Sequence, residues 1–235
     1  MCNTGVGLTP LVDGKVHHFE FRGLYDGVSI LGDRETGSIW HHITGESMYG
    51  PLAGKKLPTY NLLQMTVREA IGVYPDLPIA ISDRPITGEE HPFAPWAEKI
   101  PVLGQFFKNT MAPEDTRRPS MDIGMGVWSD RVQRYYSMES LGAADNIILD
   151  ELDGRRIAVY YAPTARAPDA IYIDATAAEW DGRVLRFDNG FSIRDGTLYD
   201  ANGRARPMER PMQLFTRWYG YALTFPETEV YTGRD

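Results

Sequence analysis

The chain has 235 residues, 43% of them hydrophobic, and a formal net charge of −8 at pH 7. This length suits one large domain or two small ones and allows roughly 70% of the unfolded surface to be buried. The acidic balance, without a Lys/Arg run, argues against a nucleic-acid partner, and no apolar run reaches the roughly 18–20 residues of a membrane span.

One stretch of the sequence occurs twice, at residues 12–21 and 180–188. Each copy has an Asp-Gly dipeptide, then a cation, then an alternation of apolar and polar residues. Asp-Gly adopts the positive φ angles of tight turns, so both copies predict a hairpin turn and its outgoing strand. The similarity continues in short apolar runs at residues 30–37 and 197–203, each interrupted by Asp and Gly.

Each copy is predicted to close with a helix and an aromatic-Pro-acid turn, over residues 62–76 and 212–227. Apolar side chains at helical spacing define one face in each; they are Leu63, Val67, Ala70 and Ile71 in the first and Leu214, Trp218, Tyr221 and Ala222 in the second. Repeated units usually bury such faces against one another. We therefore predict a β-rich α+β fold, built from two divergent copies of an antiparallel strand-hairpin-plus-helix unit that share one core.

The two copies differ in what precedes and what interrupts them. The second has a strand at residues 156–161, whereas residues 1–11 are too few to supply the equivalent strand before the first hairpin. The first copy also carries an extra segment at residues 38–57. We expect either an N-terminal truncation or a strand supplied by another chain, because the first copy would otherwise expose a sheet edge near residues 8–22.

Residues 82–116 form a Pro-rich connector, within which residues 100–107 are apolar enough to dock on the body or on a partner. The second half then predicts strands at 122–128 and 131–136, a helical turn at 138–141, a hairpin over 146–161 about Asp153-Gly154, and a strand at 170–175. The predicted organisation is a first repeat at 1–81, the connector at 82–116 and a second repeat at 117–235, in one compact domain.

Two side chains near the N-terminus have both a structural and a functional interpretation. His17 shares a strand face with Phe19 and Phe21, and Leu185 takes its place in the second copy, so we expect His17 to be a core residue. Cys2, the single cysteine, excludes an internal disulfide. We favour an inert thiol at this position, because a nucleophile or ligand would need partners brought from elsewhere in the chain.

The adjacent residues His41 and His42 are the metal candidates, because imidazole binds zinc or copper. Neighbouring residues of a regular strand face opposite ways, which argues against both binding one ion. No HExxH or CxxC spacing is present. The Gly/Pro loop at residues 50–56 lacks the phosphate-binding GxxxxGK[ST] pattern, and a packed loop is the better interpretation.

Several strings resemble the prokaryotic family known as domain of unknown function 3179 (DUF3179). They are C-N-T-G at residues 2–5, D-R-E-T-G-S-I-W at 33–40, T-G-E at 44–46, G-P-L-A-G at 50–54, residues 150–163 and F-P-E-T-E-V-Y at 225–231. The family usually has a further segment before a Cys-Pro-Leu-Cys motif, and Met1-Cys2 stands where its Leu-Cys would be. The resemblance implies an extracytoplasmic origin, although the residues after Met1 are too polar for a signal peptide. It brings no established reaction or cofactor.

Two functional hypotheses follow. The first, which we favour, is a non-catalytic binding or assembly module whose partner, or a second copy, completes the open sheet edge of the first repeat. The second is an enzyme or metal protein whose site gathers general acid-base or ligand residues; the candidates are Cys2, Asp33, Arg34, Trp40, His41 and Glu46. No Ser-His-Asp, dinucleotide-binding or kinase signature identifies a reaction.

Overall fold

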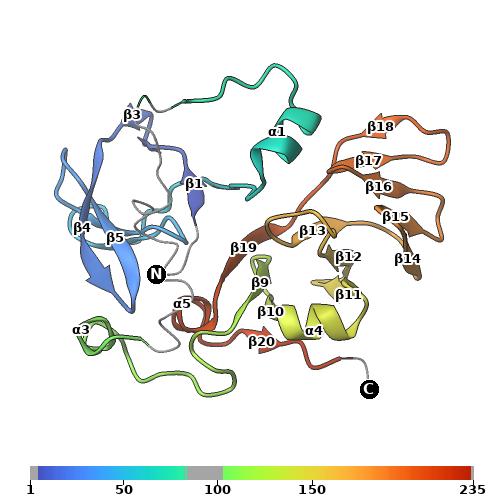
Figure 1. Cartoon of the computed structure of the whole chain (residues 1–235). Helices are drawn as coiled ribbons and strands as arrows, with labels where there is room; N and C mark the ends of the chain where they lie inside the picture. The colour runs from blue at the N-terminus through green and yellow to red at the C-terminus, as the bar shows by residue number, and fades with distance from the viewer. Residues whose placement is uncertain (1–4, 82, 84–102, 234–235) are drawn as a thin grey trace.

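The structure is a computed structural model, and it describes residues 5–81, 83 and 103–233. Small antiparallel sheets dominate it and helices are few, which confirms the prediction of a β-rich α+β fold. Figure 1 shows the N-terminal sheet at one end of the molecule and the last sheet of the C-terminal half at the other, with a central sheet between them.

The N-terminal region contains three groups of strands. Strand β1 (Val6–Leu8) pairs with β8 (Thr59–Asn61), and β2 (Leu11–Val12) pairs with β3 (Lys15–Val16) in a short hairpin. The four-stranded sheet consists of β4 (Phe19–Tyr25), β5 (Val28–Asp33), β6 (Ile39–His41) and β7 (Ser47–Tyr49), in that order. Buried Val12, Trp40 and Leu57 form the core of this region.

The central sheet has the order β19-β9-β10-β20. Its strands are β19 (Met212–Arg217), β9 (Ile123–Trp128), β10 (Gln133–Ser137) and β20 (Glu229–Val230). Two helices follow these strands directly, α4 (Met138–Ala143) after β10 and α5 (Trp218–Thr224) after β19. Helix α5 packs Trp218 and Tyr221 onto Tyr135 in a fully buried aromatic cluster.

The C-terminal half adds two more sheets. The first contains β11 (Ile147–Leu152), β12 (Arg155–Tyr160) and β13 (Asp169–Tyr172). The second runs in chain order through β14 (Ala178–Asp181), β15 (Val184–Phe187), β16 (Ser192–Arg194), β17 (Thr197–Tyr199) and β18 (Ala205–Arg206). Apolar side chains of both sheets meet in one core that includes Ile171, Leu185 and Ile193.

Asp-Gly dipeptides make four of the tight turns, and those at residues 13–14 and 153–154 were predicted from the sequence. Both residues have positive φ angles in each turn, the geometry of the turn type that suits the twist of a hairpin. The four are Asp13-Gly14 (48° and 77°), Asp26-Gly27 (49° and 68°), Asp153-Gly154 (52° and 77°) and Asp195-Gly196 (47° and 76°).

The structure does not confirm that the chain is a duplicated unit. In the first predicted copy Asp13 and Gly14 are the turn, whereas in the second Asp181 is the last residue of β14 and Gly182 begins the turn. The two stretches also belong to different sheets, at opposite ends of the molecule (Figure 1). The similar local sequence therefore specifies two hairpins without giving them equivalent surroundings.

Both helix predictions need correction. The predicted helix over 62–76 is helical only in α1 (Val67–Val73), which buries none of its residues, so its apolar face is not the expected core face. The predicted helix over 212–227 is a strand in its first part, because residues 212–217 pair along their length with β9. Ladder pairing with a neighbouring strand outweighs the helical spacing of the apolar residues there.

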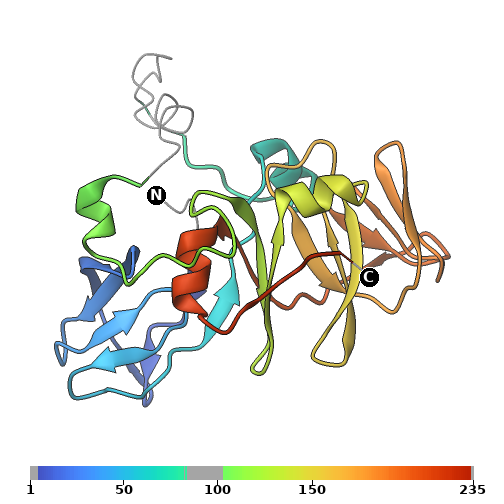
Figure 2. The same cartoon turned by 90° about the horizontal axis from the view of Figure 1, so that it is seen from below.

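Most of the predicted connector lies outside the described residues, because residues 84–102 are not described. Within the described part, α3 (Gln105–Lys108) docks on the body, which is one of the two alternatives expected for residues 100–107. The Phe107 ring packs edge-on against Tyr219 of α5, with centroids 5.6 Å apart, and Leu103 is buried. Figure 2 shows α3 beside α5 and next to the N-terminal sheet.

Among the described residues, none of the helices has the length and apolar character required to cross a membrane.

Candidate functional site

Asp33, at the end of β5, is the centre of a buried hydrogen-bond network. Its carboxylate accepts hydrogen bonds from the Trp40 indole (2.8 Å), from the Thr36 backbone N–H (2.7 Å) and from the Thr36 hydroxyl (2.9 Å to each oxygen). The side chain is fully buried. Burial alone would raise the pKa of Asp33, but the hydrogen bonds from Trp40, Thr36 and His17 outweigh it and lower the pKa, so the group is a fixed anion.

The local sequence explains this arrangement. Residues 33–37 form a turn in which the Gly37 N–H donates to the Asp33 carbonyl (3.0 Å), and Gly37 has a φ of 71°. The Thr36 hydroxyl also contacts the buried Ser38 hydroxyl (2.7 Å), which accepts from the Leu52 N–H (3.1 Å). The residues of the D-R-E-T-G-S string therefore stabilise one another and the following loop.

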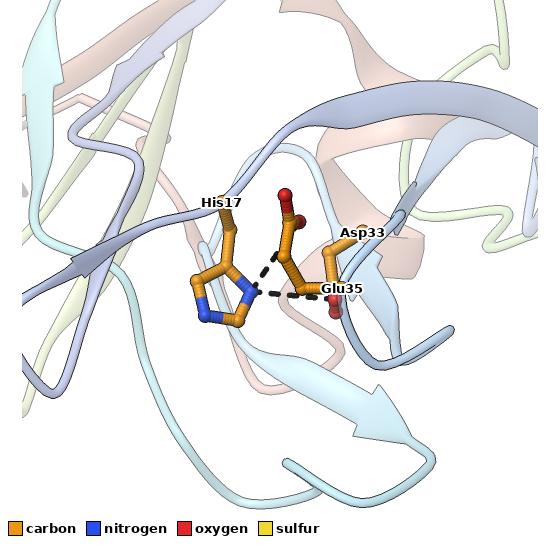
Figure 3. Close-up of side chains that lie close together, drawn as sticks. All are labelled: His17, Asp33 and Glu35. Atoms are coloured by element: carbon orange, nitrogen blue, oxygen red, sulfur yellow. Dashed lines mark hydrogen bonds and ion pairs between the residues drawn. The ribbon is translucent and has the colours of Figure 1, made fainter.

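His17 and Glu35 complete this network, and the sequence did not assign them to it. His17 Nδ1 lies 3.3 Å from Asp33 Oδ1 and 3.8 Å from Glu35 Oε2, and Figure 3 shows the ring nitrogen directed toward both carboxylates. His17 is buried, as its predicted core position requires. Glu35 also accepts from the ring (2.7 Å) and the N–H (2.9 Å) of His18, and the His18 ring is the main cause of the lowered pKa of Glu35.

His17, Asp33 and Glu35 are the one group within the described ranges whose donor atoms could hold a metal ion. One atom from each residue lies within 4.8 Å of the others. Asp33 is a poor metal ligand in this arrangement, because both of its carboxylate oxygens already accept hydrogen bonds. Glu35, whose side chain is 35% exposed, is the most accessible of the three. The group is therefore a pre-formed donor set in which a metal would have to replace existing hydrogen bonds.

The structure places the predicted catalytic candidates in separate environments. It brings Asp33 and Trp40 together. Arg34 lies on the surface near Glu20, with Arg34 Nε 3.4 Å from a carboxylate oxygen. Glu46 is exposed and contacts His41 through its backbone carbonyl, which accepts from the His41 N–H (2.8 Å). Cys2 lies outside the described residues.

His41 and His42 lie side by side, contrary to the expectation that they would face opposite ways. Strand β6 ends at His41, so the alternation of a strand does not extend to His42, and the rings stack with centroids 5.9 Å apart and planes 16° apart. His41 Nδ1 accepts from the backbone N–H groups of Ile43 and Thr44 (3.3 Å each), whereas His42 Nδ1 donates to the Ser29 carbonyl (2.6 Å). One nitrogen of each ring is therefore already engaged.

Burial lowers the pKa of His41 to about 4, with a further contribution from His42 that Asp26 partly opposes. Burial also lowers the pKa of His42, against the effect of its hydrogen bond to Ser29. Both rings are thus neutral at pH 7, the form that binds metals. No third His, Cys, Asp or Glu ligand joins them in the described part of the chain.

The β4 edge, defined as strand β4 (Phe19–Tyr25), has β5 as its one paired neighbour among the described strands. The opposite edge strand, β7, is covered where Ser47 exchanges backbone hydrogen bonds with Gly54 and Lys55. Phe21 and Tyr25 are 64% and 50% exposed along the β4 edge. An uncovered edge strand with exposed aromatic side chains is a site at which another strand can add.

Comparison with known proteins found no match among curated proteins and none among solved structures. The family described as "Protein of unknown function (DUF3179)" matches residues 1–228, almost the whole chain, including every residue of the Asp33 network and of the β4 edge. The chain belongs to this family of proteins, as the resemblance of its sequence strings predicted.

Proposed function

We propose that the protein is a non-catalytic binding module that takes up an extended segment of a partner chain at the β4 edge. The observation that carries the proposal is an edge strand whose second side pairs with no strand of the described residues, together with two exposed aromatic side chains on it. Main-chain hydrogen bonds would supply affinity in such a complex, and contacts to alternate side chains would supply specificity.

The register of β4 supports contacts on both faces of the sheet. Phe21 lies opposite Leu31, and Tyr25 lies opposite Val28. Directly opposite residues share a face, and Leu31 and Val28 are an odd number of residues apart, so Phe21 and Tyr25 lie on opposite faces. A strand added at this edge would therefore contact one aromatic ring on each face.

Features of the same strand restrict which chains could pair with it. The register shifts between Phe21 and Gly23, where β4 has a bulge, and Gly23 has a φ of 147°. The Arg22 side chain lies across Gly32 and pairs with Glu20 at 2.8 Å. Bulges and charges protect edge strands against indiscriminate pairing, so these features favour a specific partner over aggregation.

Tertiary contacts also fix the far end of the edge. The Asp26 carboxylate in the β4–β5 turn accepts from the Ala112 N–H (2.8 Å). Gly27 lies beneath side chains of Phe107, Met111 and Tyr219, at distances that leave little room for a Cβ atom. A pre-ordered edge lowers the entropy cost of binding.

Site-specific photocrosslinking in the source cells tests the proposal. A benzoylphenylalanine at position 25 should give an adduct of discrete mass, and Phe21→Lys should abolish it. The matched control places the same group at position 49, because Tyr49 of β7 is 75% exposed. Equal labelling at both positions would contradict the proposal. So would the absence of any adduct when the purified protein also sediments as a monomer; sedimentation as a dimer would identify the occupant as a second copy.

Metal binding at His17, Asp33 and Glu35 is a second candidate function, favoured by the grouping of their donor atoms. This set shares only Asp33 with the site residues predicted from the sequence. Elemental analysis of purified protein should find one equivalent of zinc, copper or iron, which Glu35→Gln should reduce. Substoichiometric amounts of all three metals would remove this candidate.

A further inference from the structure

A groove of about 730 Å³ lies between helix α1 and the C-terminal half of the chain. We call it the α1 groove; its sides are formed by residues 62–74 and by segments of residues 160–169, 180–183, 193–199 and 206–215. Figure 1 shows α1 facing the strands β16 to β18. The volume is in the range of about 300–1,000 Å³ typical of small-molecule sites.

Helix α1 covers the groove without filling it. Its start is fixed by a capping box, in which Glu69 accepts from the Thr66 N–H (2.7 Å) and the Thr66 hydroxyl (2.8 Å). Its end is close to the β16–β17 turn, because a Cβ at Gly196 would lie 3.0 Å from Val73. The helix therefore has a fixed start and a close contact at its end, while none of its residues is buried.

The floor of the α1 groove is an ordered polar network around Asp169. The carboxylate accepts from the Arg210 guanidinium (2.9–3.1 Å), from the Gln213 amide (2.8 Å) and from the Tyr160 hydroxyl (3.1 Å). Burial raises the pKa of Tyr160, which keeps its hydroxyl protonated as a donor. Asp169 neutralises the charge of Arg210. The net charge of the groove therefore depends on the residues that form its walls.

The walls carry an excess of positive charge in an otherwise acidic protein. Five arginines and three carboxylates line the groove; they are Arg68, Arg183, Arg194, Arg206 and Arg210, and Glu69, Asp169 and Asp195. Each carboxylate is already engaged, Glu69 in the capping box, Asp169 in the floor and Asp195 with Arg183 at 3.1 Å. Arg206 also pairs, at 3.7 Å, with Asp200, which does not line the groove. The positive charge available to a ligand is therefore that of the two remaining arginines.

Two of these arginines carry the inference. Arg68 on α1 and Arg194 on β16 are exposed, and neither has an ion-pair partner within the described part of the chain. Arg194 lies over the Tyr199 ring, 4.7 Å from its centroid, which orients the guanidinium at the wall. Arginine binds carboxylate and phosphate groups through paired hydrogen bonds.

Apolar side chains also line the α1 groove. Trp180, Leu198 and Phe215 line the groove beside the arginines. We propose that the α1 groove binds a small organic anion, with a carboxylate or phosphate group between Arg68 and Arg194 and an apolar body over these side chains. This site is separate from the β4 edge, so either proposal can fail without the other.

Binding of the fluorescent anion 8-anilinonaphthalene-1-sulfonate to the full chain tests this proposal. The probe should bind saturably, and the double variant Arg68→Gln/Arg194→Gln should weaken it about tenfold or more, since two charge-assisted contacts are lost. The matched control is Arg166→Gln/Arg204→Gln, which removes the same charge from exposed arginines that do not line the groove. It should change the affinity by less than about twofold.

Competition experiments on the unmodified protein identify the anionic group, and they do not depend on whether a variant folds. Phenylacetate and phenylphosphate should displace the probe, and the stronger competitor distinguishes carboxylate from phosphate; neutral benzyl alcohol should not displace it. Unaltered binding in the groove variant, equal weakening in the control, or equal displacement by benzyl alcohol would overturn the proposal. If the groove variant melts early, competition on the unmodified protein decides the outcome.

Discussion

Helices α1 and α5 have the same length and nearly the same ending but opposite surroundings. Each spans seven residues, and each stops at an aromatic residue before Pro, with φ and ψ of −128° and 80° at Tyr74 and −128° and 78° at Phe225. Five residues of α5 are buried and none of α1. Similar local signals thus end both helices, while the neighbouring elements decide whether a helix forms core.

The reason for the difference lies in the preceding strands. Helix α5 follows β19 directly, and pairing of β19 with β9 places the helix against Tyr135 and Trp128. Gly126 of β9 is needed for this approach, because a Cβ there would lie 2.0 Å from the Tyr221 ring. Helix α1 follows β8 after a loop and covers a groove. The same comparison separates a helix that forms core from one that packs none of its residues into the core.

The largest effect should come from removing the central side chain of α5. Trp218 is fully buried, donates to the Asp115 carbonyl (3.0 Å) and packs edge-on against Tyr135. Trp218→Ala should lower the free energy of unfolding by about 3–5 kcal/mol, because it leaves a cavity and an unpaired carbonyl. Urea denaturation measures the change; a loss below about 1 kcal/mol would show that α5 is not core.

The next effect tests the polar centre of the N-terminal region. Asp33→Asn should lower the free energy of unfolding by about 2–3 kcal/mol at pH 7. The substitution removes the charge of a buried carboxylate that has hydrogen-bond partners on three other residues. Asp174→Asn is the matched control, since that side chain is 96% exposed, and it should stay within about 0.5 kcal/mol.

The same substitution has a pH signature. Asp33 has a lowered pKa in the folded state, so its stabilisation is complete above the unfolded value of 3.8 and is lost as the pH falls below it. The difference in unfolding free energy between the unmodified protein and Asp33→Asn should therefore narrow below about pH 3.8. A difference that stays constant down to pH 2.5 would exclude a charged Asp33.

A smaller, pH-dependent effect belongs to His41. Its pKa is about 4 in the folded state, against about 6.5 for an unperturbed histidine side chain, so the unfolded chain takes up the proton first as the pH falls. Stability should be fully present above about pH 6.5 and fall by about 1–2 kcal/mol between pH 7 and pH 5. His41→Gln should reduce this slope, measured by urea denaturation at both pH values; an unchanged slope would contradict a buried neutral imidazole.

The smallest effect is expected on α1. Ile71 is 43% exposed, so Ile71→Ala should change the free energy of unfolding by less than about 0.5 kcal/mol. This is the counterpart of Trp218→Ala on the second helix, measured in the same way. A loss of several kcal/mol would mean that α1 is packed against a further element, and the groove beneath it would then need a different interpretation.

The sequence alone determined the features that depend on a few adjacent residues. Asp-Gly dipeptides readily adopt positive φ, and Asp13-Gly14 and Asp153-Gly154 form the hairpin turns predicted there, with the predicted strands on either side. The resemblance of residues 33–54 identified the family. Asp33 and Trp40 were two of the six site candidates, and the turn after β5 brings them into hydrogen-bond contact at 2.8 Å.

Tertiary structure decided everything that depends on which elements meet. Residues 212–217 became a strand because β9 was available for pairing, and the two Asp-Gly stretches acquired unrelated surroundings. His17 joined Asp33 across a separation of 16 residues, and the arginines of the α1 groove came from both halves of the chain. Local propensity fixes turns and caps within a few residues, whereas contacts between distant residues depend on the burial of the whole chain.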